Sequence, residues 1–272
     1  MVTVTRRIKE IKQPRGGLLP LRDFQCVEMD SFGPVLEKEN LHPSITGMAV
    51  DYLSRAITSH DRRHAFQVSL LGARLLGRQD TAYALLNQVD GLTHASIRAA
   101  CKLTGFDVVY RAGASSYKPV EGINPDNTTI NNIAMMVGRL SHFFETNHLL
   151  LDGFDLAGAY TKLIRKGDGD VVTSGGMWDV KVSRSKPSAK NTLQILIYWL
   201  MGLRSIHPQF KQVEKIGIVN PRLGKVWEIA VDMIPPETIQ YVSTEVIGYK
   251  RRRSKMLSAV IEKLLTGYGA NK

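Results

Sequence analysis

The sequence predicts an α/β protein whose core is a β-sheet covered by helices, preceded by a helical region. Apolar residues recur at helical spacing over 128–150 and 188–206. Short β-type runs occur in pairs, each pair joined by turn residues. From residue 128 the order is therefore helix, hairpin, helix, hairpin, helix, which is typical of helices packed on a sheet. A hydrophobic share of 43% supports a packed core.

Composition divides the chain into three parts. Residues 1–40 are rich in Pro, Gly and charge, which predicts an irregular arm. Residues 41–127 have helical periodicity as far as about Leu103, followed by a possible short strand at 106–110 and a turn-rich segment, and we interpret them as a helical accessory region. Residues 128–272 form the predicted core, which ends in a basic C-terminal helix.

Turn and cap residues mark the elements of the core. The first helix has Asp126 or Thr128 as its cap. The first hairpin joins KGDGDVVT to MWDVKVS through Ser174, Gly175 and Gly176. After the next helix, a second hairpin turns at PRLG, and a Pro-Glu pair at 236–237 begins the following helix.

The charge balance favours a polyanionic partner. Lys and Arg total 36 against 25 Asp and Glu, a formal excess of +11, and nucleic acid, most often DNA, is the partner that such a field suggests. Anionic lipid or an acidic protein also fits, and a protein partner or a homo-oligomer stays open. The longest apolar runs are shorter than a bilayer span and no secretory signal is evident, so we expect no membrane partner and a cytoplasmic location. Two cysteines exclude a disulfide framework and a four-thiolate metal site.

The first hairpin carries the most informative polar residues. Asp179 and Lys181 alternate along one strand and share a face, and strand pairing brings Asp170 across to them. Two carboxylates beside one ammonium are costly unless a cation neutralises them, and Mg²⁺ takes this kind of oxygen ligand. A solvated cross-strand ion pair is the purely structural alternative.

Four short motifs in order resemble the PD-(D/E)XK nuclease superfamily, in its RecB-type branch. They are Gly138-Arg139-Leu140-Ser141-His142, Gly167-Asp168-Gly169-Asp170, Asp179-Val180-Lys181 and Gln194-Ile195-Leu196-Ile197-Tyr198. The resemblance covers about residues 128–232 and implies a restriction-endonuclease-like core, a central mixed sheet flanked by helices.

The resemblance also implies roles. Asp170, Asp179, the Val180 carbonyl and His142 would hold Mg²⁺ or Mn²⁺, and Lys181 would be the catalytic lysine. Gln194 and Tyr198 would border the site, while Asp168 is an alternative first acid. Structural alternatives stay open: a packed histidine at 142, with His148 and Glu145 as neighbours, a surface glutamine at 194 and a core tyrosine at 198.

The sequence therefore predicts a metal-dependent nuclease, either exonuclease or endonuclease, that hydrolyses phosphodiester bonds. The basic run Lys250, Arg251, Arg252 and Arg253 is expected to contact phosphates, although a solvated helix face has the same composition. The alternatives are a nucleic-acid-binding or complex-assembly protein that keeps the fold without turnover, and a basic α/β scaffold in which the D-x-K is accidental. The absence of a G-x-x-x-x-G-K-[ST] phosphate loop argues against ATP-driven activity in the chain itself.

Overall fold

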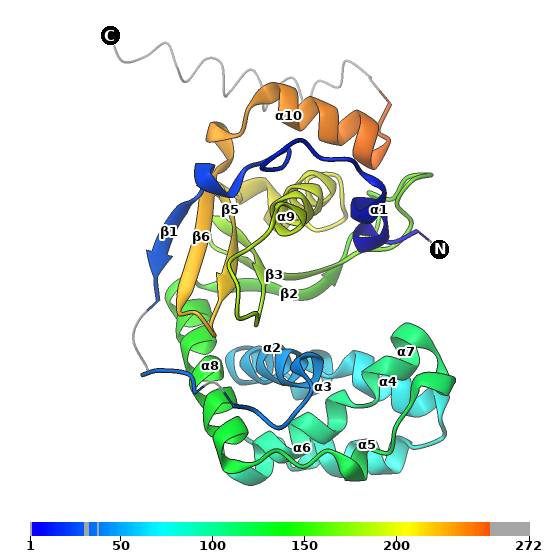
Figure 1. Cartoon of the computed structure of the whole chain (residues 1–272). Coiled ribbons are helices and arrows are strands. Elements are labelled where there is room, and N and C mark those ends of the chain that lie inside the picture. Colours follow the sequence, from blue (N-terminus) through cyan, green and yellow to red (C-terminus); the bar gives the residue numbers. More distant parts are fainter. Residues whose placement is uncertain (1, 30–32, 37, 251–272) are drawn as a thin grey trace.

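The computed structural model describes residues 2–29, 33–36 and 38–250, and it is a three-layer arrangement around one mixed sheet (Figure 1). Helices α1, α9 and α10 cover one face of the sheet, and α2 and α8 cover the other. This confirms the predicted α/β class. Among the described residues, no helix has both the length and the hydropathy that crossing a bilayer requires.

Six strands form the sheet in the order β1-β6-β5-β4-β3-β2. Their bounds are β1 Gln25–Glu28, β2 Leu149–Asp155, β3 Asp168–Thr173, β4 Gly176–Val180, β5 Lys215–Asn220 and β6 Lys225–Ala230. Only β4 and β5 pair in parallel, and the other neighbours in this sheet are antiparallel. A parallel pair needs a long crossover, which the helix α9, Ala189–Gly202, supplies.

The helices fall into two groups. Those before the core are α1 Val4–Glu10, α2 Pro43–Ser59, α3 Arg62–Ala65, α4 Gln67–Leu75, α5 Gln79–Asn87, α6 His94–Thr104 and α7 Asp107–Ala112. Those within it are α8 Asn127–Thr146, α9 and α10 Pro236–Tyr241, which continues as a π-helical segment Val242–Ile247. The Thr129 N–H donates to Asp126 Oδ1 at 2.8 Å, so Asp126 is the predicted cap of α8.

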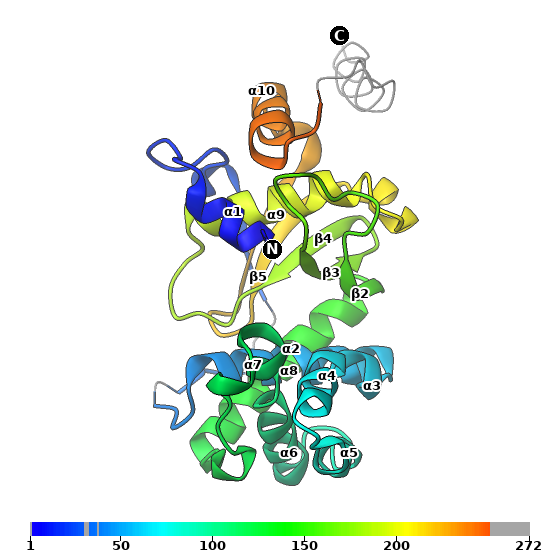
Figure 2. The ribbon, with the colours of Figure 1, turned by 90° about the vertical axis from the view of Figure 1, so that its right-hand side faces the viewer.

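Alternation along the strands separates two apolar cores. Val172 and Met177 point to the face covered by α9, whose Leu193, Ile197 and Leu200 are fully or almost fully buried against it. Val171 and Trp178 point to the other face, where they pack in one cluster with Leu53 of α2, Ile97 of α6 and Ile133 of α8. The helical region and the sheet therefore share a core. Figure 2 shows the helical layer against this face of the sheet.

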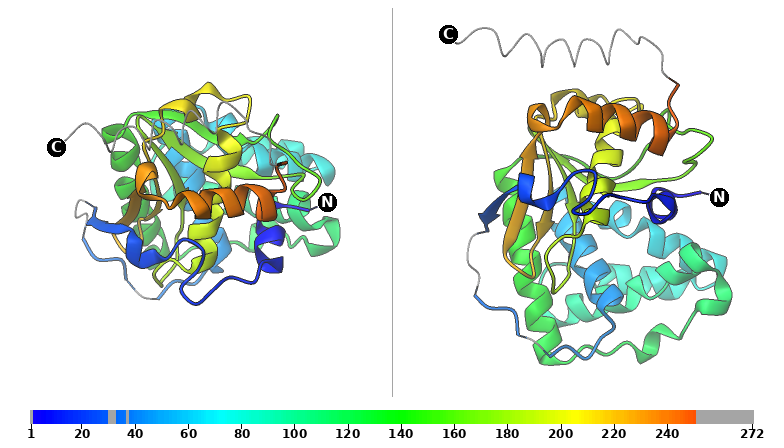
Figure 3. Two further views of the ribbon diagram at one scale, coloured as in Figure 1. Left: turned by 90° about the horizontal axis from the view of Figure 1, so that it is seen from above. Right: turned by 45° about the horizontal axis from the view of Figure 1, so that its top comes forward.

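Three local predictions differ from the structure. The arm 1–40 contains the helix α1 and the strand β1, both docked on the core, because Val4 and Ile8 are buried and β1 pairs with β6. Residues 106–110 belong to a helix, α7, because Asp107 and Val109 are buried in helix packing rather than paired in a sheet. Strand β2 was not predicted, since its apolar residues follow α8 directly. Figure 3 shows the N-terminal segment running across the outside of α9.

Candidate active site

The hairpin β3–β4 places two aspartates opposite each other. Its register pairs Val171 with Trp178 and Thr173 with Gly176, so Asp170 lies opposite Asp179 at the next position. The register is held by the Trp178 side chain, whose Nε1 donates to Thr173 Oγ1 at 2.8 Å. Side chains that face each other across antiparallel strands have Cβ atoms about 4.5–5.5 Å apart. The two carboxylates are therefore neighbours, Asp179 buried and Asp170 half-buried.

Lys181 contacts this pair from the end of β4. Its Nζ lies 2.6 Å from Asp179 Oδ2, and its backbone N–H donates to the Val219 carbonyl at 2.9 Å, which extends the β4–β5 ladder. Asp170 Oδ2 accepts from the Val180 N–H at 2.8 Å. The structure thus brings together Asp170, Asp179 and Lys181, as predicted, and Asp170 rather than Asp168 is the residue opposite Asp179.

The three groups perturb one another. Burial, and then the charge of Asp179, raises the pKa of Asp170 to about 7. Burial also raises the pKa of Asp179. Burial alone would lower the pKa of Lys181, but the carboxylates of Asp179 and Asp170 outweigh it and raise that pKa. Lys181 is therefore an ammonium, and its single positive charge interacts with two carboxylates.

Helix α9 presents the predicted polar pair on the same side of the sheet. Gln194 Nε2 donates to Tyr198 Oη at 3.1 Å, as their four-residue spacing allows. Burial, and then the charge of Asp179, raises the pKa of Tyr198. Its phenol therefore keeps its proton and can donate a hydrogen bond beside the carboxylates.

A third carboxylate, Asp51, approaches from α2 and was not predicted. Its charge contributes to the raised pKa values of Asp170 and Asp179. Helix α2 passes close to the residues that follow β4, since a Cβ at Gly47 would lie in ordinary contact with Val182 Cβ, at 3.9 Å. The signal in the sequence was Gly47-Met48-Ala49-Val50-Asp51, the same spacing as the motif at 138–142 but with a carboxylate in place of the imidazole.

Asp51 is held by a buried arginine that also serves a second acid. Arg55 Nε and Nη2 donate to Asp51 Oδ1 and Oδ2 at 3.1 and 3.2 Å, and Arg55 Nη1 lies 3.8 Å from Asp152 Oδ2. His64 Nε2 lies 3.4 Å from Asp152 Oδ1 on the other side of that carboxylate. Gly153, with φ +54°, leaves room for Arg55, since a Cβ at this position would collide with Arg55 Nη1.

Asp51, Arg55 and Asp170 line a hollow of about 260 Å³ between the sheet and the helical region. Its sheet wall carries carboxylates, and its helical wall carries cationic and aromatic side chains. The first group is Asp155, Asp168 and Asp170, and the second includes Arg55, Tyr110 and Arg111. Acidic and cationic side chains therefore face each other across this hollow.

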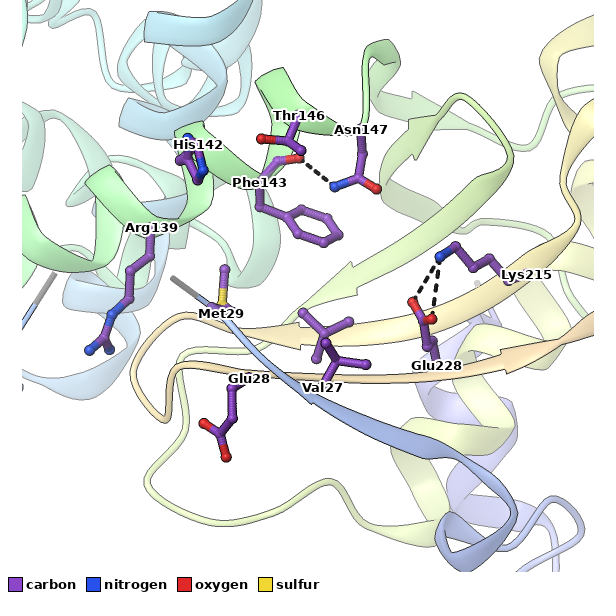
Figure 4. Close-up of a pocket in the computed structure, with 11 residues that line it drawn as sticks. Val27, Glu28, Met29, Arg139, His142, Phe143, Thr146, Asn147, Lys215 and Glu228 are labelled. Atoms are coloured by element: carbon purple, nitrogen blue, oxygen red, sulfur yellow. Dashed lines mark hydrogen bonds and ion pairs between the residues drawn. The ribbon is translucent and has the colours of Figure 1, made fainter. Parts of the chain in front are cut away.

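The structure does not bring His142 to the carboxylates. Its place on α8 lines a different hollow of about 240 Å³, with Val27 and Met29 near the β1 edge and Glu228 on β6 (Figure 4). Helix α2, rather than α8, brings a polar side chain to Asp170. The prediction of His142 as a ligand beside Asp170 is therefore corrected.

The donor set fits a hard cation with few protein ligands. Within residues 2–29, 33–36 and 38–250, no three His, Cys, Asp or Glu side chains are grouped as a metal centre would require. Asp179 Oδ2 is buried and accepts no hydrogen bond of good geometry, its contact being the close approach of Lys181 Nζ. Mg²⁺ commonly takes one or two carboxylates, completed by water and substrate phosphate. Two carboxylates and the Val180 carbonyl suit that chemistry.

The predicted phosphate-binding run lies mostly beyond the described part of the chain. Lys250 is exposed at its end, and Arg251, Arg252 and Arg253 are outside the described residues.

Comparison with known proteins adds no relative. No protein-family model, no curated protein and no solved structure matches this chain.

Proposed function

We propose that this chain is a metal-dependent nuclease that hydrolyses phosphodiester bonds, with DNA as its substrate. The observation that carries the proposal is the opposition of Asp170 and Asp179 across β3 and β4, with the Lys181 ammonium 2.6 Å from Asp179. A buried and a half-buried carboxylate with raised pKa values, next to one ammonium, are a typical signature of a functional site.

The order of elements supports the same proposal. Helix α8 is followed by the antiparallel strands β2, β3 and β4, then by the crossover helix α9 and by β5, parallel to β4. This is the arrangement that a restriction-endonuclease-like core would have, with the acids on the second and third strands and the Gln194–Tyr198 pair on the crossover helix. The formal excess of +11 charges agrees with a polyanionic substrate.

Each residue then has a chemical role. Asp170, Asp179 and the Val180 carbonyl would hold Mg²⁺ or Mn²⁺, and the bound ion would activate water and stabilise the leaving oxygen. Lys181, kept protonated by its two acidic neighbours, would donate hydrogen bonds to the attacked phosphate and offset the charge that develops on it.

The surrounding residues orient these groups. Gln194 donates to Tyr198 Oη, and the Tyr198 hydroxyl would in turn donate its proton to the substrate phosphate or to bound water and so position it. Arg55 fixes the Asp51 carboxylate at the mouth of the hollow and, being buried, holds it in one geometry.

The test is cleavage of labelled linear, circular and single-stranded DNA, and of RNA, with Mg²⁺, Mn²⁺ or EDTA. We expect metal-dependent cleavage of DNA that is lost in Asp179→Asn and Lys181→Gln. Lys215→Gln is the matched control, because Lys215 Nζ pairs with Glu228 Oε2 at 3.1 Å across β5 and β6, outside the site. This control is expected to cleave as the wild type does.

Two outcomes contradict the proposal. Binding of DNA without cleavage under every metal condition favours a non-catalytic nucleic-acid-binding protein with this fold. Cleavage that persists in Asp179→Asn and Lys181→Gln would place the chemistry elsewhere.

A further inference from the structure

The hollow beside Asp170 continues into a second one along α4. The second hollow, about 260 Å³ in volume, shares Gln67 and Leu71 with the first and extends to Arg74 and Tyr83. We call the two together the α4 groove. Figure 2 shows α4 between α7, near the strand ends, and α5.

Two tyrosines on this groove are exposed. Tyr110, on α7, is 41% exposed and Tyr83, on α5, is 42% exposed, while Leu71 between the two hollows is 41% exposed. Side chains of this size exposed along one groove are typical of a binding surface.

A cation accompanies each tyrosine. Lys166 Nζ lies 4.6 Å from the centre of the Tyr110 ring, and Arg63 Cζ lies 5.5 Å from the centre of the Tyr83 ring. Arg111, on the wall of the first hollow, has a side chain that is 53% exposed, and its Nε lies 3.6 Å from Asp107 Oδ2. Each of the two exposed rings on the groove thus has a cation over one of its faces, supplied by a residue next to the groove.

We propose that the α4 groove binds a single-stranded segment of nucleic acid that leads to the carboxylates. Tyr110 and Tyr83 stack on bases, and Lys166, Arg63 and Arg111 contact phosphates. This inference rests on the proposed nuclease function and adds the form of its substrate.

The chemistry of the groove selects this occupant. Proteins that bind single strands combine a positive groove with aromatic side chains on which bases stack. In a duplex the flat faces of the bases are covered by their neighbours, so exposed rings gain little from it.

Fluorescence anisotropy in EDTA tests the inference without cleavage. The probes are a labelled oligothymidylate, an abasic strand of the same length and a hairpin duplex. We expect the oligothymidylate to bind most tightly. Tyr110→Ala and Tyr83→Ala should each weaken its binding by about 5- to 150-fold, the usual effect of losing one stacked base.

Three controls separate stacking from folding and from general charge. Tyr110→Phe keeps the ring and should bind as the wild type does. Tyr241→Ala removes a tyrosine of similar exposure, 44%, on α10 at the opposite side of the sheet, and should have no effect. Lys166→Gln should reduce the salt dependence of binding by about one phosphate contact, while the exposed Lys211→Gln should not.

The outcomes distinguish this inference from the nuclease proposal. The single-strand groove would be overturned if the abasic strand and the oligothymidylate bind equally, or if the duplex binds more tightly. It would also be overturned if Tyr110→Ala and Tyr83→Ala bind the oligothymidylate as Tyr241→Ala does. If single strands bind in a tyrosine-dependent way but are not cleaved in Mg²⁺ or Mn²⁺, the single-strand groove is supported and the proposed nuclease activity is refuted.

Discussion

The buried charge of Asp170 makes the metal-free protein less stable at alkaline pH, and Asp170→Asn should relieve this. The folded protein holds a proton on Asp170 up to about pH 7, whereas the unfolded chain releases it near pH 3.8. Because the native state binds more protons between these values, stability falls as the pH rises through this window and is constant above it. Asparagine carries no charge at any pH, and its side-chain oxygen can still accept from the Val180 N–H.

The size of the effect follows from the two pKa values. From 3.8 to about 7 is about three pH units, and about 1.4 kcal/mol per unit gives about 4 kcal/mol. Part of this energy is the repulsion between Asp170 and Asp179. The surroundings also relax around a buried charge, and this relaxation lowers the cost. We therefore expect Asp170→Asn to be more stable than the wild type by about 2–4 kcal/mol at pH 8.

Urea unfolding followed by circular dichroism at pH 5 and pH 8, with EDTA present, measures this difference. The wild type should lose stability between the two values, and Asp170→Asn should change much less. Adding Mg²⁺ at pH 8 should restore the stability of the wild type, since an ion that binds only the folded state stabilises that state. The same addition should change the stability of Asp170→Asn little.

Asp232→Asn is the control, because Asp232 is an exposed aspartate away from the hollow. A variant Asp170→Asn that is less stable than the wild type at pH 8 and has the same pH dependence would refute this reasoning. The Asp170 carboxylate would then stabilise the fold, through its hydrogen bond with the Val180 N–H, rather than destabilise it in the absence of a cation.

Three further substitutions test other parts of the site. Lys181→Gln should lower the cleavage rate by about 10²-fold or more while binding of DNA in EDTA is retained, and an equal loss of binding would contradict a role in the reaction. Tyr198→Phe should destabilise the fold by about 1 kcal/mol in urea unfolding through loss of the Gln194 hydrogen bond, and an unchanged stability would mean that this bond contributes nothing. Gly153→Ala should lower the free energy of unfolding by about 1–3 kcal/mol, because φ at this position is +54° and Arg55 occupies the space of a Cβ. A lower midpoint of thermal unfolding measures this loss, and an unchanged midpoint would show that Arg55 is not fixed.

The elements that the sequence predicted are those marked by strong local chemistry. The turn at Ser174 and Gly175, the cap at Asp126 and the apolar period of α9 are each encoded within a few residues. The pair Asp170 and Asp179 was predictable for the same reason, because a short hairpin relates residues that are close in sequence.

The missing parts depend on distant packing. Asp51 reaches the site because α2 packs against α8 and approaches both β2 and the residues after β4, and no local pattern in the sequence reports that packing. The motif at 138–142 has the expected spacing, but its His142 lines a different hollow from Asp170. Strand β1 was missed because its four residues are all exposed and carry no alternating pattern.

The apolar core that α2 and α6 share with Trp178 makes the two halves of the chain one cooperative unit. A fragment starting near residue 128 would expose the faces of Val171 and Trp178 to water and would lack both Asp51 and the rim residue Tyr110. Such a truncation is expected to aggregate rather than to yield a minimal catalytic domain. On the nuclease proposal, substrate selection and chemistry would depend on the same folding event, so neither could be transplanted without the other.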